Sequence, residues 1–140
     1  MTRAELESYR SMRGEIRELR ERINNLKDDD SIVDADTILD YKTGKGIPKT
    51  IVGVNMERYW RKKQRYEKKI ENLQSECSRI EEWIEDIEDS ITRRIFRLTY
   101  IDGKTQLEVG RAVRLERSVI SRRIKEYMQR KETQKAQEAR

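Results

Sequence analysis

The chain has 140 residues, of which 42% are charged and 34% are hydrophobic. Ordinary globular domains carry about 25% charged residues, so this composition excludes a thick core and favours long, solvated helices with narrow apolar seams. One Cys and no His exclude an internal disulfide, a nucleophile–His dyad and a zinc site of nitrogen and sulfur ligands. We therefore expect a non-enzyme with no metal, no cofactor and no small-molecule substrate.

The sequence also gives no sign of membrane insertion. No apolar run approaches the roughly 18 residues that a membrane span requires. The residues after Met1 alternate charged and apolar side chains and do not resemble a signal-peptide core. We expect a cytoplasmic protein without a membrane partner.

The net charge of +5 is distributed unevenly along the chain. Residues 51–69 contain seven basic and two acidic side chains, whereas residues 70–89 contain one basic and eight acidic side chains. Residues 90–140 contain fourteen basic and six acidic side chains, which gives a net charge of +8. A basic excess concentrated at one end of a chain is typical of a nucleic-acid-binding surface, although a solvated helical surface gives the same pattern.

Residues 1–27 are expected to form one coiled-coil helix. Thr2 and Glu5 have the spacing of a capping box at its start. Apolar side chains then recur at alternating intervals of three and four residues, as in a coiled-coil seam. The seam consists of Tyr9, Met12, Ile16, Leu19, Ile23 and Leu26. Residues 28–54, with Asp, Gly and the single Pro of the chain, are expected to form a flexible linker.

Residues 55–89 are expected to form a second, longer coiled-coil helix. Its heptad a positions are Met56, Lys63, Ile70, Cys77 and Ile84, and its d positions are Tyr59, Tyr66, Leu73, Ile80 and Ile87. A stripe this narrow needs a partner helix. Either the first helix folds back to form an antiparallel hairpin, or two or more chains associate as a homo-oligomer.

Three short helices are expected within residues 90–130. The first covers about 90–100 and ends at the turn formed by Asp102 and Gly103. Thr105 and Glu108 form a capping box for the second helix, and the third covers about 117–129. Residues 131–140 lack an apolar seam and are expected to be a disordered tail. The expected fold class is thus all-α, with coiled-coil helices followed by a three-helix module.

The second and third of these helices have the pattern of a helix-turn-helix. Such a module needs a small residue where the helices approach, apolar residues around the turn, and a polar, basic outward face on the second helix. Gly110 is the small residue, and Arg114 occupies the turn position that often requires a left-handed backbone. The apolar residues are Val109, Val113, Leu115, Ile120 and Ile124. The outward face contains Arg117, Ser118, Ser121, Arg122 and Lys125.

The stretch from Tyr100 to Lys125 resembles region 4 of the sigma-70 family. The shared pattern is a Tyr, a Gly-x-Thr turn, a Glu-Val-Gly sequence and a helix rich in Ser and Arg. The complete chain is similar in organisation to phage late-gene transcriptional activators of the ArpU/RinA type. This resemblance implies a phage-encoded transcriptional regulator that binds promoter DNA in the bacterial host cytoplasm and contacts RNA polymerase.

The resemblance also implies roles for individual side chains. Arg117, Ser118, Ser121 and Arg122 would face the bases of double-stranded DNA. Lys104, Thr105, Arg111, Arg123 and Lys125 would contact phosphates. Two alternatives remain, namely a small terminase subunit for phage DNA packaging and a coiled-coil interaction protein without DNA binding. Subunit stoichiometry and DNA affinity distinguish them.

Overall fold

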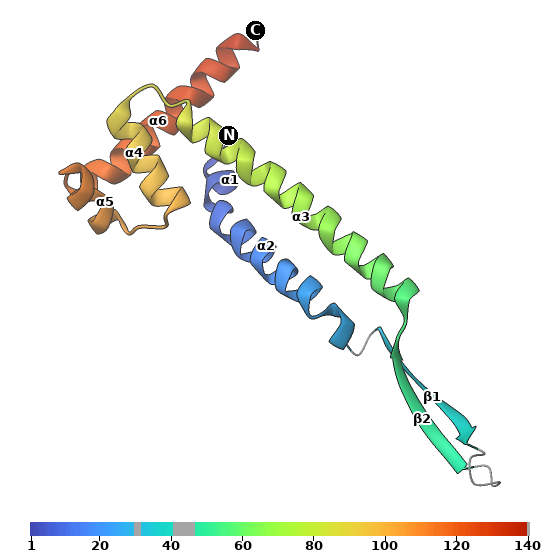
Figure 1. Ribbon diagram of the computed structural model, residues 1–140. Coiled ribbons are helices and arrows are strands. Elements are labelled where there is room, and N and C mark those ends of the chain that lie inside the picture. Colours follow the sequence, from blue (N-terminus) through green and yellow to red (C-terminus); the bar gives the residue numbers. More distant parts are fainter. Residues whose placement is uncertain (30–31, 41–46, 140) are drawn as a thin grey trace. The chain divides into compact units, whose positions relative to one another are not determined.

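The computed structural model describes residues 1–29, 32–40 and 47–139, and the described chain is mostly helical (Figure 1). The helices are α1 (Arg3–Glu7), α2 (Tyr9–Asn24), η1 (Leu26–Asp28), α3 (Met56–Glu85), α4 (Ser90–Phe96), η2 (Arg97–Ile101), α5 (Gln106–Val113) and α6 (Arg117–Glu138), and the strands are β1 (Val33–Asp40) and β2 (Ile47–Val54). The high helix content is consistent with the expected all-α fold class. No helix in the described part of the chain is long and apolar enough to cross a membrane.

The contacts divide the chain into two compact units. One contains residues 15–72, and the other contains residues 1–14 together with residues 73–140. Both α2 and α3 contribute residues to each unit because the division falls inside these helices.

The N-terminal helix is interrupted at Ser8, where one uninterrupted helix was expected. Thr2 caps α1, and its hydroxyl accepts a hydrogen bond of 3.1 Å from the amide of Glu5. The Ser8 hydroxyl donates a 2.6 Å hydrogen bond to the Glu5 carbonyl, in competition with the helical backbone. This local competition separates α1 from α2.

The unit formed by residues 15–72 has a small apolar core. Leu26, Ile32 and Tyr59 are buried together, and Tyr66 packs against them. The side chain of Asn55 accepts a 3.1 Å hydrogen bond from the amide of Arg58 and so caps the start of α3. Asp34 accepts hydrogen bonds from the side chains of Asn55 and Arg58, each at 3.0 Å, and this ties β1 to that cap.

A β-hairpin occupies most of the segment that was expected to be a flexible linker. Strands β1 and β2 pair antiparallel, from Val33 opposite Val54 to Asp40 opposite Ile47. The Gly, Pro and Asp residues in 28–54 suggested a linker, but this segment also contains β-branched runs such as Thr50-Ile51-Val52. The expectation was therefore wrong for these strands. Residues 41–46 of the expected linker lie outside the described residues.

The apolar stripe of α3 is buried as its heptad pattern predicted, except at the start of the helix. Ile70, Leu73, Cys77 and Ile80 each have 9% or less of their surface exposed, whereas Met56 is 48% exposed. Burial also raises the pKa of the Cys77 thiol. Cys77 thus has the environment of a small apolar residue rather than that of a reactive thiolate.

An aromatic cluster forms the centre of the second unit. The ring of Phe96, which is fully buried, lies 5.8 Å from Trp83, 5.6 Å from Tyr100 and 5.2 Å from Tyr127. Trp83 and Tyr127 are also in edge-on contact. These rings belong to α3, α4, η2 and α6. Trp83 thus joins the end of α3 to the C-terminal helices.

The last helix is longer than expected. Residues 131–138 continue α6 to Glu138 and are all exposed, so the expectation of a disordered tail was wrong for this stretch. Lys, Glu, Gln and Ala have high intrinsic helix propensity, and this propensity extends the helix without a packed face. Arg140 lies outside the described residues.

Replacing Phe96 with Ala is expected to lower the free energy of unfolding by about 3–5 kcal/mol, because it removes the buried ring that the other aromatic residues contact. Replacing Trp60, which is 51% exposed, with Ala is the matched control and should change that free energy by less than about 1 kcal/mol. Urea unfolding followed by circular dichroism measures both. Equal losses in the two variants would contradict the central role of Phe96.

Candidate nucleic-acid interface

The start of α5 is fixed by the capping box that the sequence predicted. The Thr105 hydroxyl accepts a 3.2 Å hydrogen bond from the amide of Glu108, and the Thr105 amide donates to the Glu108 carboxylate at 3.4 Å. The Thr105 hydroxyl also donates to the Glu108 carboxylate, at 3.1 Å. The hydrogen bond from the Thr105 amide, followed by that from the Thr105 hydroxyl, lowers the pKa of Glu108. Thr105 was expected to contact phosphate, but its hydroxyl is already engaged within the chain.

The turn between α5 and α6 closes in a left-handed conformation at Arg114. Its φ of 59° and ψ of 46° make it the one non-glycine residue with positive φ in the described chain. The Leu115 amide then donates a 2.9 Å hydrogen bond to the Gly110 carbonyl. This is the six-to-one bond of a Schellman motif, which satisfies a terminal carbonyl of α5.

Gly110 allows the two helices to approach closely. A Cβ atom at this position would lie 2.5 Å from the carbonyl oxygen of Leu115, a distance that real side chains do not tolerate. The prediction that residue 110 must be small is therefore confirmed. Arg94 supports the same turn from α4 by donating a 3.1 Å hydrogen bond to the carbonyl of Ala112.

The inward and outward faces of α6 divide as the helical period predicted. The inward residues Ile120, Ile124, Tyr127 and Met128 are at most 7% exposed. The five residues predicted for the outward face are all exposed; they are Arg117, Ser118, Ser121, Arg122 and Lys125. Three of these residues are cations and two are hydroxyl donors, so this face can neutralise phosphates and form hydrogen bonds with base edges.

The arginines of this face make only weak contacts within the chain. Arg122 lies 4.0 Å from Glu126, and both side chains are two-thirds exposed. The Nε of Arg117 donates to the Gln106 side chain at 3.3 Å. Exposed pairs of this kind contribute little to stability and exchange readily for another ligand. Sequence reasoning missed Gln106, which orients Arg117 and lines one shallow hollow with Ser118 and Ser121.

The predicted phosphate-contacting residues are not brought to a single face. Lys104 is half-exposed beside Glu108 at 3.9 Å, and Arg111 and Lys125 are exposed on α5 and α6. Arg123 is only partly exposed, and it lies 3.7 Å from Asp89 at the start of α4. The structure therefore gives Arg123 a positioning contact between α4 and α6.

Asp89 connects the capping of α4 with the placement of α6. Its carboxylate accepts hydrogen bonds from the amide of Thr92 at 2.9 Å and from the hydroxyl of Thr92 at 2.7 Å. The side-chain hydrogen bond from Thr92 is the main cause that lowers the pKa of Asp89, and the neighbouring Arg123 and Arg93 add to it. The ionised Asp89 carboxylate thus both accepts the capping hydrogen bonds from Thr92 and attracts the guanidinium of Arg123.

An arginine-rich hollow flanks α6 beside Asp89. Three arginines and two carboxylates are among the residues that line it, namely Arg122, Arg123, Arg130, Asp89 and Glu126, together with Thr92, Val119 and Tyr127. The guanidinium of Arg130 lies 5.3 Å from the centre of the Tyr127 ring, a cation–π distance. Sequence reasoning missed Arg130 because it assigned that residue to the end of the module, whereas α6 continues beyond it.

Comparison of the chain with protein-family models, with curated proteins and with solved structures gives no match. Function is therefore inferred from the residues of this chain and their geometry.

Replacing Arg114 with Gly is expected to raise the free energy of unfolding by about 1 kcal/mol, because glycine adopts positive φ without a steric penalty. Replacing Arg111 with Gly removes the same side chain from inside α5 and should lower that free energy by about 1 kcal/mol. Thermal and urea unfolding measure both variants. The same sign of change in the two proteins would argue against strain at Arg114.

Replacing Asp89 with Ala is expected to lower the free energy of unfolding by about 1 kcal/mol near neutral pH, because α4 loses its cap. The pKa of Asp89 is lowered on folding, so its charge stabilises the protein fully above the unfolded pKa of about 3.9. That contribution is lost as the pH falls through the folded pKa. The difference between the two proteins in urea unfolding should shrink in acid. A difference that persists unchanged in strong acid would exclude the ionised carboxylate as its cause.

Proposed function

We propose that residues 90–130 are a helix-turn-helix module that binds double-stranded DNA, and that the chain is a sequence-specific transcriptional regulator. The observation that carries this proposal is the outward face of α6, where Arg117, Ser118, Ser121, Arg122 and Lys125 are all exposed. These side chains follow directly on a tight turn that holds α6 against α5.

The geometry of the turn supports this proposal. A helix-turn-helix requires two helices at a steep angle, joined by three or four residues, with the second helix free to enter the major groove. Here residues 114–116 join α5 to α6, and the Gly110 contact fixes the approach of the helices. The buried side of α6 packs on α4 and α5, which leaves the opposite side available for a ligand.

The charge distribution supports nucleic acid as that ligand. Residues 90–140 have a net charge of +8, and the cations of the outward face are not neutralised by strong internal pairs. A protein that neutralises phosphates gains affinity through the release of counterions, and this gain depends on salt concentration.

The proposed roles follow from the chemistry of each side chain. Arg117 and Arg122 have the planar donor pair that matches guanine O6 and N7, while Ser118 and Ser121 can bond to any base edge. Lys104, Arg111 and Lys125 would contact phosphates and set the register on the duplex. We assign Arg123 a supporting phosphate contact, because its pairing with Asp89 limits its reach.

The similarity to sigma-70 region 4 and to ArpU/RinA-type activators supports a role in transcription. On this basis we propose a phage-encoded regulator that acts in the host cytoplasm and contacts RNA polymerase. Most of the apolar stripe of α3 is buried within the single chain, so association with further copies of the chain would rest on Met56 and Trp60, which are about half-exposed at the start of the helix.

Replacing Arg122 with Ala is expected to weaken binding to the preferred duplex by about 1–3 kcal/mol, and to relax discrimination at one or two base pairs. The preferred duplex would first be selected from a random pool. Fluorescence anisotropy with that duplex and a scrambled one, at several salt concentrations, gives affinity and discrimination together. Equal losses on both duplexes, with folding intact, would exclude Arg122 from base recognition.

Replacing Lys104 with Ala is the matched comparison within the same module. It should weaken binding to both duplexes alike and reduce the slope of log affinity against log salt by about one unit. The two substitutions should therefore differ in kind as well as in size. If the unsubstituted protein binds no duplex, the proposed function is wrong and a coiled-coil interaction protein is favoured.

A further inference from the structure

The first half of α3 carries a second basic surface, which the proposed helix-turn-helix module does not include. Its six cations recur every three or four residues along one side of the helix, as the 3.6-residue period requires. We call them the α3 basic stripe, which consists of Arg58, Arg61, Lys62, Arg65, Lys68 and Lys69. Lys62 is partly exposed and the other five are exposed.

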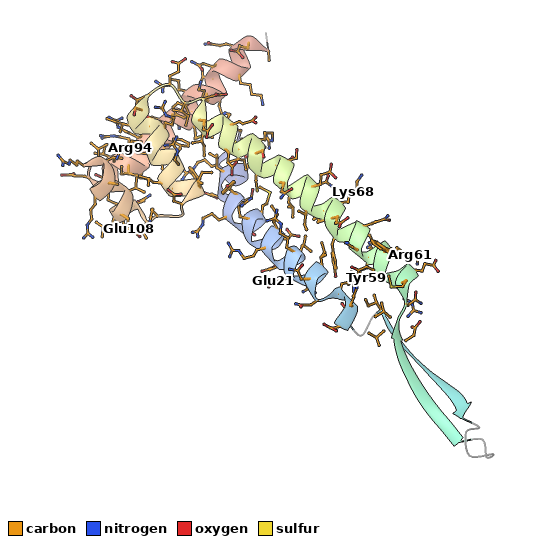
Figure 2. The ribbon with its side chains drawn as sticks, viewed as in Figure 1. Glu21, Tyr59, Arg61, Lys68, Arg94 and Glu108 are labelled. Carbon is orange, nitrogen blue, oxygen red and sulfur yellow. The ribbon has the colours of Figure 1, made fainter. Side chains whose placement is uncertain are left out.

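The stripe lies away from the packed side of α3. Tyr59 and Ile70, on that packed side, are each only 9% exposed. Arg61 and Lys68 point away from α2 in Figure 2. The stripe is therefore accessible to a partner while the apolar side of the helix remains covered within its own unit.

The internal ion pairs of the stripe are concentrated at its beginning. Arg58 pairs with Asp34 at 3.0 Å, Arg61 pairs with Glu57 at 2.8 Å, and Lys62 pairs with Asp29 at 3.2 Å. Farther along, Arg65, Lys68 and Lys69 form no ion pair or hydrogen bond among the residues that the structure describes. Three neighbouring cations without a counter-charge repel one another, and a bound polyanion would relieve that repulsion.

Amide side chains complete this part of the surface. Gln64 and Asn72 line one shallow groove together with Arg61, Arg65, Lys68 and Lys69. Amides and guanidinium groups both donate hydrogen bonds to phosphate oxygens. The groove thus presents a continuous row of donors and contains no carboxylate.

The charge spacing matches that of a nucleic acid backbone. Residues 58–69 extend over about 16 Å at 1.5 Å per residue. A DNA strand carries one phosphate per 3.4 Å of duplex axis, so this length corresponds to about five phosphates. The stripe's six cations, three of which also form internal ion pairs, are similar in number to these phosphates. A membrane surface fits less well, because an interfacial helix needs an exposed apolar face and that face of α3 is packed.

We propose that the α3 basic stripe binds the phosphate backbone of double-stranded DNA without sequence preference, as a contact additional to that of α6. This inference extends the proposed function. Its residues lie in residues 15–72, whereas α6 belongs to the other unit, so substitutions can separate the two contacts.

The test replaces two unpaired cations of the stripe, in the variant Arg65→Gln/Lys68→Gln of the full chain. Glutamine keeps a high helix propensity, so α3 should remain folded, which circular dichroism checks. Each lost phosphate contact reduces the slope of log affinity against log salt by about 0.9, so the slope on a scrambled duplex should fall by about 1.8. The affinity for preferred and scrambled duplexes should fall by the same factor.

The matched control is Arg17→Gln/Arg20→Gln on α2. It removes the same charge from two exposed arginines of the same unit, and it should leave the salt slope unchanged. An unchanged slope in the stripe variant, or an equal reduction in the control, would overturn the proposal. Loss of binding to phosphatidylserine vesicles with unchanged affinity for duplexes would also overturn it, in favour of a membrane surface.

The same measurements separate this inference from the proposed function. If the stripe variant lowers the slope while the unsubstituted protein binds preferred and scrambled duplexes equally, the stripe is supported and sequence-specific binding by α6 fails. If Arg122→Ala loses discrimination while the stripe variant keeps the full slope, the stripe fails and the proposed function stands.

Discussion

The close approach of Gly110 to the carbonyl oxygen of Leu115 is the constraint on which the C-terminal helices depend. A Cβ atom at residue 110 would lie 2.5 Å from that oxygen, so any other residue would force the turn open. The same turn holds Arg114 at positive φ, a conformation that costs an L-residue about 1 kcal/mol or more. Packing around the turn offsets this cost. The benefit is that α6 starts at a fixed place and angle relative to α5.

Two further contacts keep α6 in that position from its other side. Phe96 packs on Tyr127 and thereby joins α4 to the buried face of α6. Asp89 caps α4 and lies 3.7 Å from Arg123 of α6. These contacts involve the inward and lateral faces of the helix. The outward face therefore does not take part in the packing of α6 against α4 and α5. The proposed function requires a positioned helix with one free, basic face, and α6 has such a face.

Electrostatics distinguish the surfaces of this chain more clearly than hydrophobicity does. Residues 70–89 have a net charge of −7, whereas residues 51–69 have +5 and residues 90–140 have +8. The acidic stretch separates two basic ones, and each basic stretch presents its cations mainly to solvent. Such cations act on a polyanion over about a Debye length, roughly 8 Å at physiological salt. Their contribution to binding any polyanion therefore depends strongly on ionic strength.

The sequence by itself determined the features that depend on short-range rules. The Thr105 capping box, the left-handed turn at Arg114, the small residue at 110 and the buried face of α6 all follow from residues within one or two helical turns. The β-hairpin was missed because strand pairing joins residues up to 21 positions apart, such as Val33 and Val54, where local Gly and Pro signals mislead. The packing of Trp83 on Phe96 and Tyr127, and the pairing of Arg123 with Asp89, were likewise decided only by tertiary structure. Local backbone rules act on neighbours in sequence, whereas burial and charge pairing act on neighbours in space.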